Sequence, residues 1–186
     1  TRTRGDDNPS PLLLDPTCGS GTFLALALER GFQVRGYDIN PQCVQGTRQN
    51  LVHMFGEERV QDGHVTIECR DSSRNHPCQP DNGEVQRPSC LVANLPWGVN
   101  TRTYVDENIR ILQSLHKTLS PGTPCVVVTK LSDPSLFEES GFHILAQAQI
   151  PPVGFKLPKT TKKDQVDDID PRNGRNSCVI TFASSE

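Results

Sequence analysis

The chain has 186 residues, of which 34% are hydrophobic and 22% are charged, and its formal net charge is −3. This length fits one domain with a buried core, and the composition excludes a fully disordered or collagen-like chain. Because 22 acidic residues outnumber 19 basic ones, a surface that is basic all over is excluded, and any nucleic acid must meet a local patch or another subunit.

In chain order, apolar runs, helical periodicity and Pro or Gly stops predict eleven elements. They are strand 12–15, helix 23–30, strand 33–38, helix 41–55, strand 64–69, strand 90–94, helix 103–119, strand 124–129, helix 134–140, strand 142–150 and strand 177–183. The 103–119 helix is predicted from apolar positions 105, 109, 112, 115 and 119. Two polar stretches, a tail over 1–10 and an insert over 151–176, contain no periodicity.

Alternating strands and helices indicate an α/β fold, a doubly wound and mostly parallel seven-stranded sheet. No helix separates the last two strands, which predicts an antiparallel hairpin at the C-terminal edge. We expect residues 1–186 to form a single domain, since no second periodic region follows the insert. No apolar run reaches the length of a membrane helix and no signal peptide opens the sequence, so we expect an intracellular protein, cytoplasmic or nuclear, with no membrane partner.

The seven cysteines and five histidines indicate no metal site. The cysteines form no C-x-x-C pair, and the histidines show no H-E-x-x-H spacing. Cys18 lies in a glycine loop, where a helix N-terminus could lower a thiol pKa, but no histidine stands near it in the motif. We therefore expect no metal and no nucleophilic role for Cys18.

The first strand ends at Asp15 and is followed by a glycine loop, residues 16–22, before a helix. This order places a ligand against a helix N-terminus at the carboxyl end of a sheet, although a tight turn alone would also account for the glycines. The loop lacks the lysine of a nucleoside triphosphate P-loop. Asp38 and Asp71 stand at the ends of the next two strands, where acids can bind ribose hydroxyls and an adenine amino group. The residues alone leave two cofactors open, a dinucleotide or S-adenosylmethionine.

The fourth strand leads into Asn94-Leu95-Pro96-Trp97-Gly98. The Asn94 side chain and the backbone carbonyls that follow offer acceptors for both hydrogens of an exocyclic amino group, while Trp97 can stack on its ring. A turn with a core tryptophan is the alternative interpretation. Trp97 is the one tryptophan of the chain and stands between Pro and Gly, which favours the binding role.

With these two motifs the chain resembles the Rossmann-like, class I S-adenosylmethionine-dependent methyltransferases. Asp15-Pro16-Thr17-Cys18-Gly19-Ser20-Gly21-Thr22 and Asn94-Leu95-Pro96-Trp97 are similar to the motifs of the THUMP-associated RNA guanine-N2 methyltransferases. The resemblance implies S-adenosylmethionine as cofactor and methyl transfer to guanine N2 in tRNA or another structured RNA. It implies a catalytic set of Asn94, Leu95, Pro96 and Trp97, and cofactor contacts from Asp15, Thr17, Cys18, Gly19, Ser20, Gly21, Thr22, Asp38, Ile39, Asp71, Ser72 and Asn94.

Three alternatives stay open from the sequence. They are an adenine-N6 methyltransferase on DNA or RNA, a catalytically silent cofactor-binding scaffold, and an NAD-dependent oxidoreductase on a similar sheet. Only about eleven residues precede the first strand, where the resembling family carries an RNA-binding THUMP domain. The resemblance therefore implies that an RNA-binding domain or a small zinc-ribbon activating subunit is supplied elsewhere.

The polar insert holds the densest basic cluster of the chain, Lys156, Lys159, Lys162 and Lys163. If the insert lies at the cofactor end of the sheet, these lysines could contact RNA phosphates beside the target base. Four aspartates follow them and could neutralise the cluster, in which case the insert is only a solvated loop.

Overall fold

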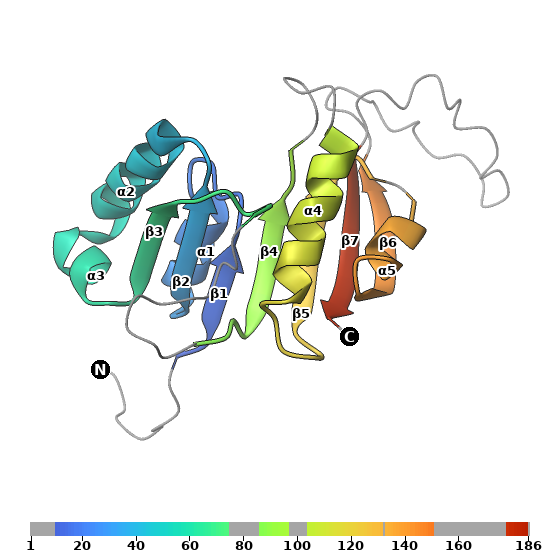
Figure 1. Cartoon of the computed structure of the whole chain (residues 1–186). Coiled ribbons are helices and arrows are strands. Elements are labelled where there is room, and N and C mark those ends of the chain that lie inside the picture. Colours follow the sequence, from blue (N-terminus) through green and yellow to red (C-terminus); the bar gives the residue numbers. More distant parts are fainter. Residues whose placement is uncertain (1–9, 75–85, 97–103, 132, 151–177, 186) are drawn as a thin grey trace, which may run out of the picture.

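The computed structural model describes residues 10–74, 86–96, 104–131, 133–150 and 178–185 (Figure 1). Its strands are β1 (Leu12–Asp15), β2 (Gln33–Asp38), β3 (Val65–Cys69), β4 (Cys90–Asn94), β5 (Pro124–Thr129), β6 (Phe142–Ile150) and β7 (Cys178–Ser185). Its helices are α1 (Thr22–Glu29), α2 (Pro41–Phe55), α3 (Glu57–Gln61), α4 (Tyr104–His116) and α5 (Ser135–Glu138). All seven predicted strands are present, and α3 was not predicted.

The strands form one sheet in the order β3-β2-β1-β4-β5-β7-β6. The five strands β3, β2, β1, β4 and β5 are parallel, and β7 lies antiparallel between β5 and β6. The predicted fold class, a mostly parallel doubly wound sheet with an antiparallel C-terminal hairpin, is confirmed. Among the described residues, no helix is both long enough and apolar enough to cross a membrane.

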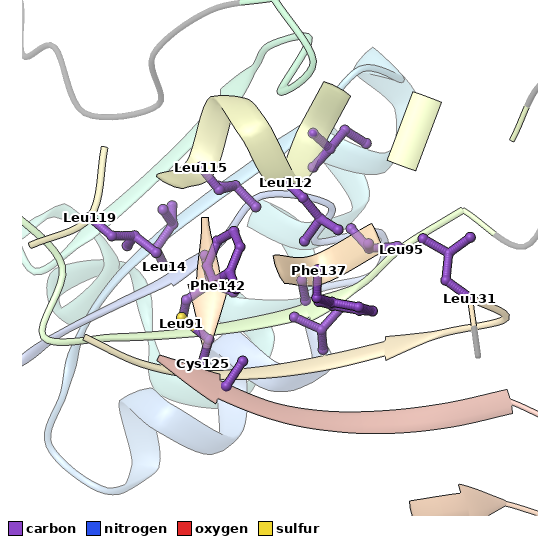
Figure 2. Packing of buried hydrophobic residues seen from close by; sticks show 14 of the residues in the cluster. Leu14, Leu91, Leu95, Leu112, Leu115, Leu119, Cys125, Leu131, Phe137 and Phe142 are labelled. Atoms are coloured by element: carbon purple, nitrogen blue, oxygen red, sulfur yellow. The ribbon is translucent and has the colours of Figure 1, made fainter. Parts of the chain in front are cut away.

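Successive side chains of β1 pack on opposite faces of the sheet, as the two-residue period of a strand requires. Leu14 joins a core formed with α4 and α5, whereas Leu13 joins a core formed with α1 and α2. Figure 2 shows the first core, in which Leu112 and Leu115 of α4 and Phe137 of α5 point toward the sheet. Helices on both faces explain why the central strands are continuous apolar runs.

The buried residues of α4 differ from the predicted apolar positions, since Asn108, Ile111 and Ser114 are buried although the periodicity did not select them. Periodicity placed Ile109 in the core, but Ile109 is half-buried, and the neighbouring Asn108 has 0% exposure. Asn108 stands three residues after Val105 and four before Leu112, so it shares their side of the helix. A polar residue therefore occupies a core position of this helix.

Strand direction decides where a ligand can bind. Because β1 to β5 are parallel, the residues that follow β1, β2, β3 and β4 meet at one edge of the sheet. β6 and β5 are both antiparallel to β7, so β6 also ends at that edge. The lysines of the 151–176 insert lie outside the described residues, and their predicted role stays a prediction.

Replacing Phe137 with alanine should lower the free energy of unfolding by about 3–5 kcal/mol, since the side chain is fully buried and its removal leaves a cavity. Urea unfolding followed by circular dichroism measures this change. Leu26→Ala is the control, because Leu26 of α1 is 46% exposed and its truncation should cost roughly 0.5 kcal/mol or less. Equal losses in both variants would contradict this view of the core.

Candidate functional site

The glycine loop between β1 and α1 is held by the carboxylate of Asp38. One carboxylate oxygen of Asp38 accepts from the backbone N–H of Gly19 at 2.9 Å, and the other accepts from the N–H of Asn40 at 2.8 Å. From α2, the Thr47 hydroxyl donates to the Gly19 carbonyl at 2.7 Å, and the Asn50 amide donates to the Ser20 carbonyl at 3.0 Å. The loop is thus fixed by β2 and α2, through bonds made within the protein itself.

Most described N–H groups of this loop are already paired within the protein. The N–H groups of Thr17, Cys18, Gly19 and Gly21 donate to Asp15 Oδ1, the Tyr37 carbonyl, Asp38 Oδ2 and the Cys18 carbonyl, respectively. A phosphate-binding loop needs such groups free to face the phosphate oxygens. The loop is therefore a poor cradle for the pyrophosphate of a dinucleotide.

Close packing explains two of the loop residues. Gly21 has a φ of +85°, and a Cβ there would lie 2.7 Å from Cγ2 of Thr47. Glycine is needed at position 21 for two reasons. The left-handed backbone conformation disfavours a side chain, and Thr47 leaves no room for a Cβ. Cys18 is buried at 6% exposure, and burial raises the pKa of its thiol to about 12. A protonated, buried thiol is not a nucleophile, as expected from the sequence.

Asp15 is a buried carboxyl group beneath the loop. Its exposure is 1%, and burial raises its pKa from 3.8 to about 7, with a further contribution from the negative charge of Asp38. The Thr17 N–H donates to Asp15 at 3.1 Å and partly offsets this rise. Asp15 therefore positions the start of the loop rather than lining an open surface.

A cleft of about 190 Å³ opens at the carboxyl edge of the sheet, beside the loop. It is lined by Pro16, Thr17, Asp38, Ile39, Arg70, Asp71, Ser72, Asn94, Pro96, Glu107 and Ile111. The residues come from the ends of β1, β2, β3 and β4 and from α4. This is the place at which an open α/β sheet binds its ligands.

Seven of the predicted site residues meet in this cleft. They are Thr17, Asp38, Ile39, Asp71, Ser72, Asn94 and Pro96. The other described ones, Asp15, Cys18, Gly19, Ser20, Gly21, Thr22 and Leu95, are not among the residues that line it. Trp97 lies outside the described residues, so its stacking role stays a prediction.

The turn after β3 is more strongly bound within the protein than the sequence indicated. Asp71 accepts from the N–H and hydroxyl of Ser73 and forms an ion pair with Arg74 at 3.1 Å. The Ser72 hydroxyl donates to the Pro16 carbonyl at 2.7 Å, which ties this turn to the glycine loop. Asp71 thus caps its own turn while also facing the cleft.

Hydrogen bonds from three parts of the fold hold the motif after β4. The Thr17 hydroxyl donates to the Asn94 carbonyl at 3.0 Å, the Leu95 N–H donates to the Val128 carbonyl at 2.9 Å, and the Asn108 amide donates to the Pro96 carbonyl at 3.0 Å. The Leu95 side chain is buried at 1% exposure in the core under α4. Leu95 therefore anchors the motif, and only its backbone is left for a ligand.

Sequence reasoning missed Pro16, Arg70, Glu107 and Ile111 as cleft residues. Arg70 lies over the Tyr37 ring at 5.2 Å and pairs with Glu68. Among the lining residues, Asp38, Asp71 and Glu107 carry carboxylates against the single cation of Arg70, so the described lining is net negative. A negative cleft favours a ligand that carries positive charge.

A second, basic hollow of about 140 Å³ borders the cleft along α4 and the turn after β3. It is lined by Ser73, Arg74, Arg110, Gln113, Ser114 and Lys117. Its described lining contains three cations and no carboxylate, and the neighbouring residues Ser72 and Ile111 belong to the cleft. An anionic group adjacent to a ligand in the cleft would meet this hollow.

No protein-family model matches the chain. Over 114 residues it is 30% identical to a tRNA (guanine(10)-N2)-dimethyltransferase of Methanothermobacter thermautotrophicus, a match that covers 59% of the chain and 30% of the relative. The chain thus spans less than a third of that relative. Its fold matches TrmN from Thermus thermophilus with a TM-score of 0.67 and 15% identity, covering 96% of the chain and 45% of TrmN. It also matches StiE O-MT with a TM-score of 0.63, 13% identity, and coverage of 95% and 68%.

The raised pKa of Asp15 predicts how stability depends on pH. Between about pH 4 and about pH 7 the folded state holds a proton on Asp15 that the unfolded state has lost, so the free energy of unfolding should fall as pH rises through this window. The fall attributable to Asp15 should approach about 4 kcal/mol, since one pKa unit corresponds to about 1.4 kcal/mol.

Urea unfolding at several pH values measures this effect. Asp15→Asn keeps an acceptor for the Thr17 N–H but cannot ionise, so it should lack this fall and be the more stable protein above pH 7. Asp106→Asn, at an exposed position of α4, should keep the wild-type profile. Parallel profiles for Asp15→Asn and wild type would show that Asp15 titrates normally.

Proposed function

Since the chain has the fold of the class I S-adenosylmethionine-dependent methyltransferases, we propose that it binds S-adenosylmethionine and transfers its methyl group to an exocyclic amino group of a nucleobase. The acceptor proposed is guanine N2 in tRNA or another structured RNA. Three groups of residues support the proposal: the glycine loop, the negative cleft and the motif after β4.

One observation carries the choice of cofactor. The N–H groups of Thr17, Cys18, Gly19 and Gly21 are satisfied within the protein, and the cleft beside them is net negative. A dinucleotide would bring a pyrophosphate with two negative charges into these surroundings. A sulfonium nucleoside brings positive charge instead, so the geometry favours S-adenosylmethionine over NAD.

Asp38 is the residue proposed to hold the ribose. Each of its oxygens already accepts one backbone N–H, and a carboxylate has about four lone-pair sites, so roughly two remain for the ribose hydroxyls. Its orientation is fixed before the ligand arrives. Ile39, with 63% exposure, offers an apolar surface beside it for the adenine ring.

The motif after β4 is proposed to hold the methyl acceptor. S-adenosylmethionine, when bound, supplies an electrophilic methyl group, so the protein chiefly needs to align the amine. Asn94 and the Leu95 carbonyl would accept the two amine hydrogens and stabilise the positive charge that develops on nitrogen. Transfer to the aligned amine would release one amine proton to water, so no strong general base would be required beside Asn94.

Guanine N2 is favoured by the Asn94-Leu95-Pro96-Trp97 motif and by the name of the 30% identical relative. Adenine N6 is the alternative acceptor, and product analysis of a methylated nucleic acid separates the two. A silent scaffold is the alternative for the chain as a whole. An RNA-binding domain or a zinc-ribbon activating subunit supplied elsewhere belongs to the proposal.

Two substitutions should separate cofactor binding from methyl transfer. Asp38→Ala should weaken S-adenosylmethionine binding by roughly 10- to 150-fold, because hydrogen bonds to a charged group are worth about 1.5–3 kcal/mol. Asn94→Ala should lower the rate of methyl transfer about 100-fold while cofactor affinity stays within a few-fold of wild type. Calorimetry measures the first quantity, and single-turnover transfer to RNA measures the second.

The controls decide between the alternatives. NAD titrated into the wild-type protein should give no binding heat. Unchanged S-adenosylmethionine affinity in Asp38→Ala would remove Asp38 from the site, and normal transfer by Asn94→Ala would favour the scaffold. Both variants need a wild-type melting temperature, since Asp38 also holds the Gly19 loop.

The basic hollow predicts how RNA affinity depends on salt. Arg110→Gln with Lys117→Gln should weaken RNA binding and flatten the slope of log affinity against log salt, by up to about 0.7 for each phosphate that the protein no longer neutralises. S-adenosylmethionine affinity should not change. Arg74 is left in place because it also pairs with Asp71.

Arg30→Gln, directly after the end of α1, is the control, since Arg30 carries a positive charge outside the hollow. It should leave the salt slope unchanged. Filter binding at four or more salt concentrations, with any required partner subunit present, gives the slopes. Equal slopes for wild type and the double variant would place RNA phosphates elsewhere on the protein.

A further inference from the structure

Asn108 is a polar residue inside the apolar side of α4. Its side chain has 0% exposure, and its neighbours on the same side of the helix, Ile111, Leu112 and Leu115, belong to the core. A helix that packs on a sheet normally carries an apolar residue at such a position. Packing therefore gives no reason for an asparagine here.

Of the two polar groups of the Asn108 side-chain amide, only one has a hydrogen-bond partner among the described residues. Its Nδ2 donates to the Pro96 carbonyl at 3.0 Å, while its Oδ1 is buried and has no hydrogen-bond partner among the described residues. A buried acceptor without a partner destabilises the folded state. An apolar side chain of the same shape would avoid this cost but would also leave the Pro96 carbonyl unbonded.

Pro96 depends on this bond more than another residue would. Proline has no N–H, so the carbonyl is its single backbone group for hydrogen bonding. The two preceding residues are held from the glycine loop and from β5, through the Asn94 carbonyl and the Leu95 N–H. Asn108 of α4 fixes the third residue, Pro96, which directly precedes Trp97.

We infer that Asn108 is a positioning residue for the methyl-acceptor motif, which it fixes by donating to the Pro96 carbonyl. The inference rests on the proposed function for its effect on the rate of transfer. Asn108 lines neither the cleft nor the basic hollow, so it acts through Pro96 and not by touching a ligand. The unpartnered Oδ1 of Asn108 lowers the stability of the folded protein, and this loss accompanies the Nδ2 donor that bonds to Pro96.

Asn108→Leu is the main test, because it removes the donor and the orphan acceptor together. Its melting temperature should equal or exceed that of wild type, while kcat for methyl transfer should fall roughly 10- to 100-fold, the effect expected of a slight misplacement of the acceptor. S-adenosylmethionine affinity should stay within about three-fold of wild type, since loss of a positioning bond should not alter cofactor contacts. Leu115→Met is the matched control on the same side of α4 and should change neither kcat nor cofactor affinity.

The fluorescence of Trp97 provides a readout that needs no enzymatic activity. It is the one tryptophan of the chain and directly follows Pro96. Acrylamide quenching of Trp97 should be faster in Asn108→Leu than in wild type, and unchanged in Leu115→Met. If wild type transfers no methyl group, the proposed function fails, but this comparison still tests the positioning of the motif.

Asn108→Asp covers the case in which the leucine variant does not fold. An ionised carboxylate cannot donate to the Pro96 carbonyl, whereas a protonated carboxyl group can. In the folded protein, Trp97 quenching of the Asp variant should therefore approach that of wild type as pH falls. Wild-type quenching of Trp97 in folded Asn108→Leu, or in folded Asn108→Asp at every pH, would overturn the inference. Wild-type kcat in Asn108→Leu would also overturn it.

Discussion

The carboxylate of Asp38 links the end of β2 to the glycine loop after β1 and to the start of α2. It accepts from Gly19 in the loop after β1 and from Asn40 at the start of α2, while Asp38 itself ends β2. α2 then returns two bonds to the loop carbonyls through Thr47 and Asn50. The turn after β3 is tied to the same loop, because the Ser72 hydroxyl donates to the Pro16 carbonyl. Because these hydrogen bonds form before a ligand binds, less conformational entropy is lost on binding.

The strands could be predicted because both faces of the sheet are covered, which makes the central strands continuous apolar runs. The start of α2 was equally clear, since Asn40 caps it by accepting from the Gln42 N–H at 2.9 Å and Pro41 fits the first turn. α3 could not be predicted, because Glu57–Gln61 contains one apolar residue and shows no helical period. Local signals are strong where burial or capping imposes them and weak in a short helix such as α3, in which no residue is buried.

The acids of the site could be predicted from the order of strands, since every parallel strand ends at the same edge. Arg70 and Glu107 could not, because their meeting in the cleft depends on where α4 passes over the turn after β3. Periodicity also could not choose between Asn108 and Ile109. Both are one helical turn from Val105 and from Leu112, and an apolar preference selects the wrong one. The burial of Asn108 against Pro96 depends on tertiary packing, which a hydrophobic pattern in the sequence does not encode.

The position of β7 has a consequence for how the chain folds during synthesis. β7 comes last in the described chain, yet it lies between β5 and β6, and Thr129 pairs with Val179 across 50 positions of sequence. Until that segment has left the ribosome, β5 has an unpaired edge and β6 has no neighbour in the sheet. Such pairing is slow because a long loop must close first, and an open strand edge in the interval invites association with other chains. Nascent protein that stalls within the insert would therefore be a substrate for chaperones rather than a nearly complete fold.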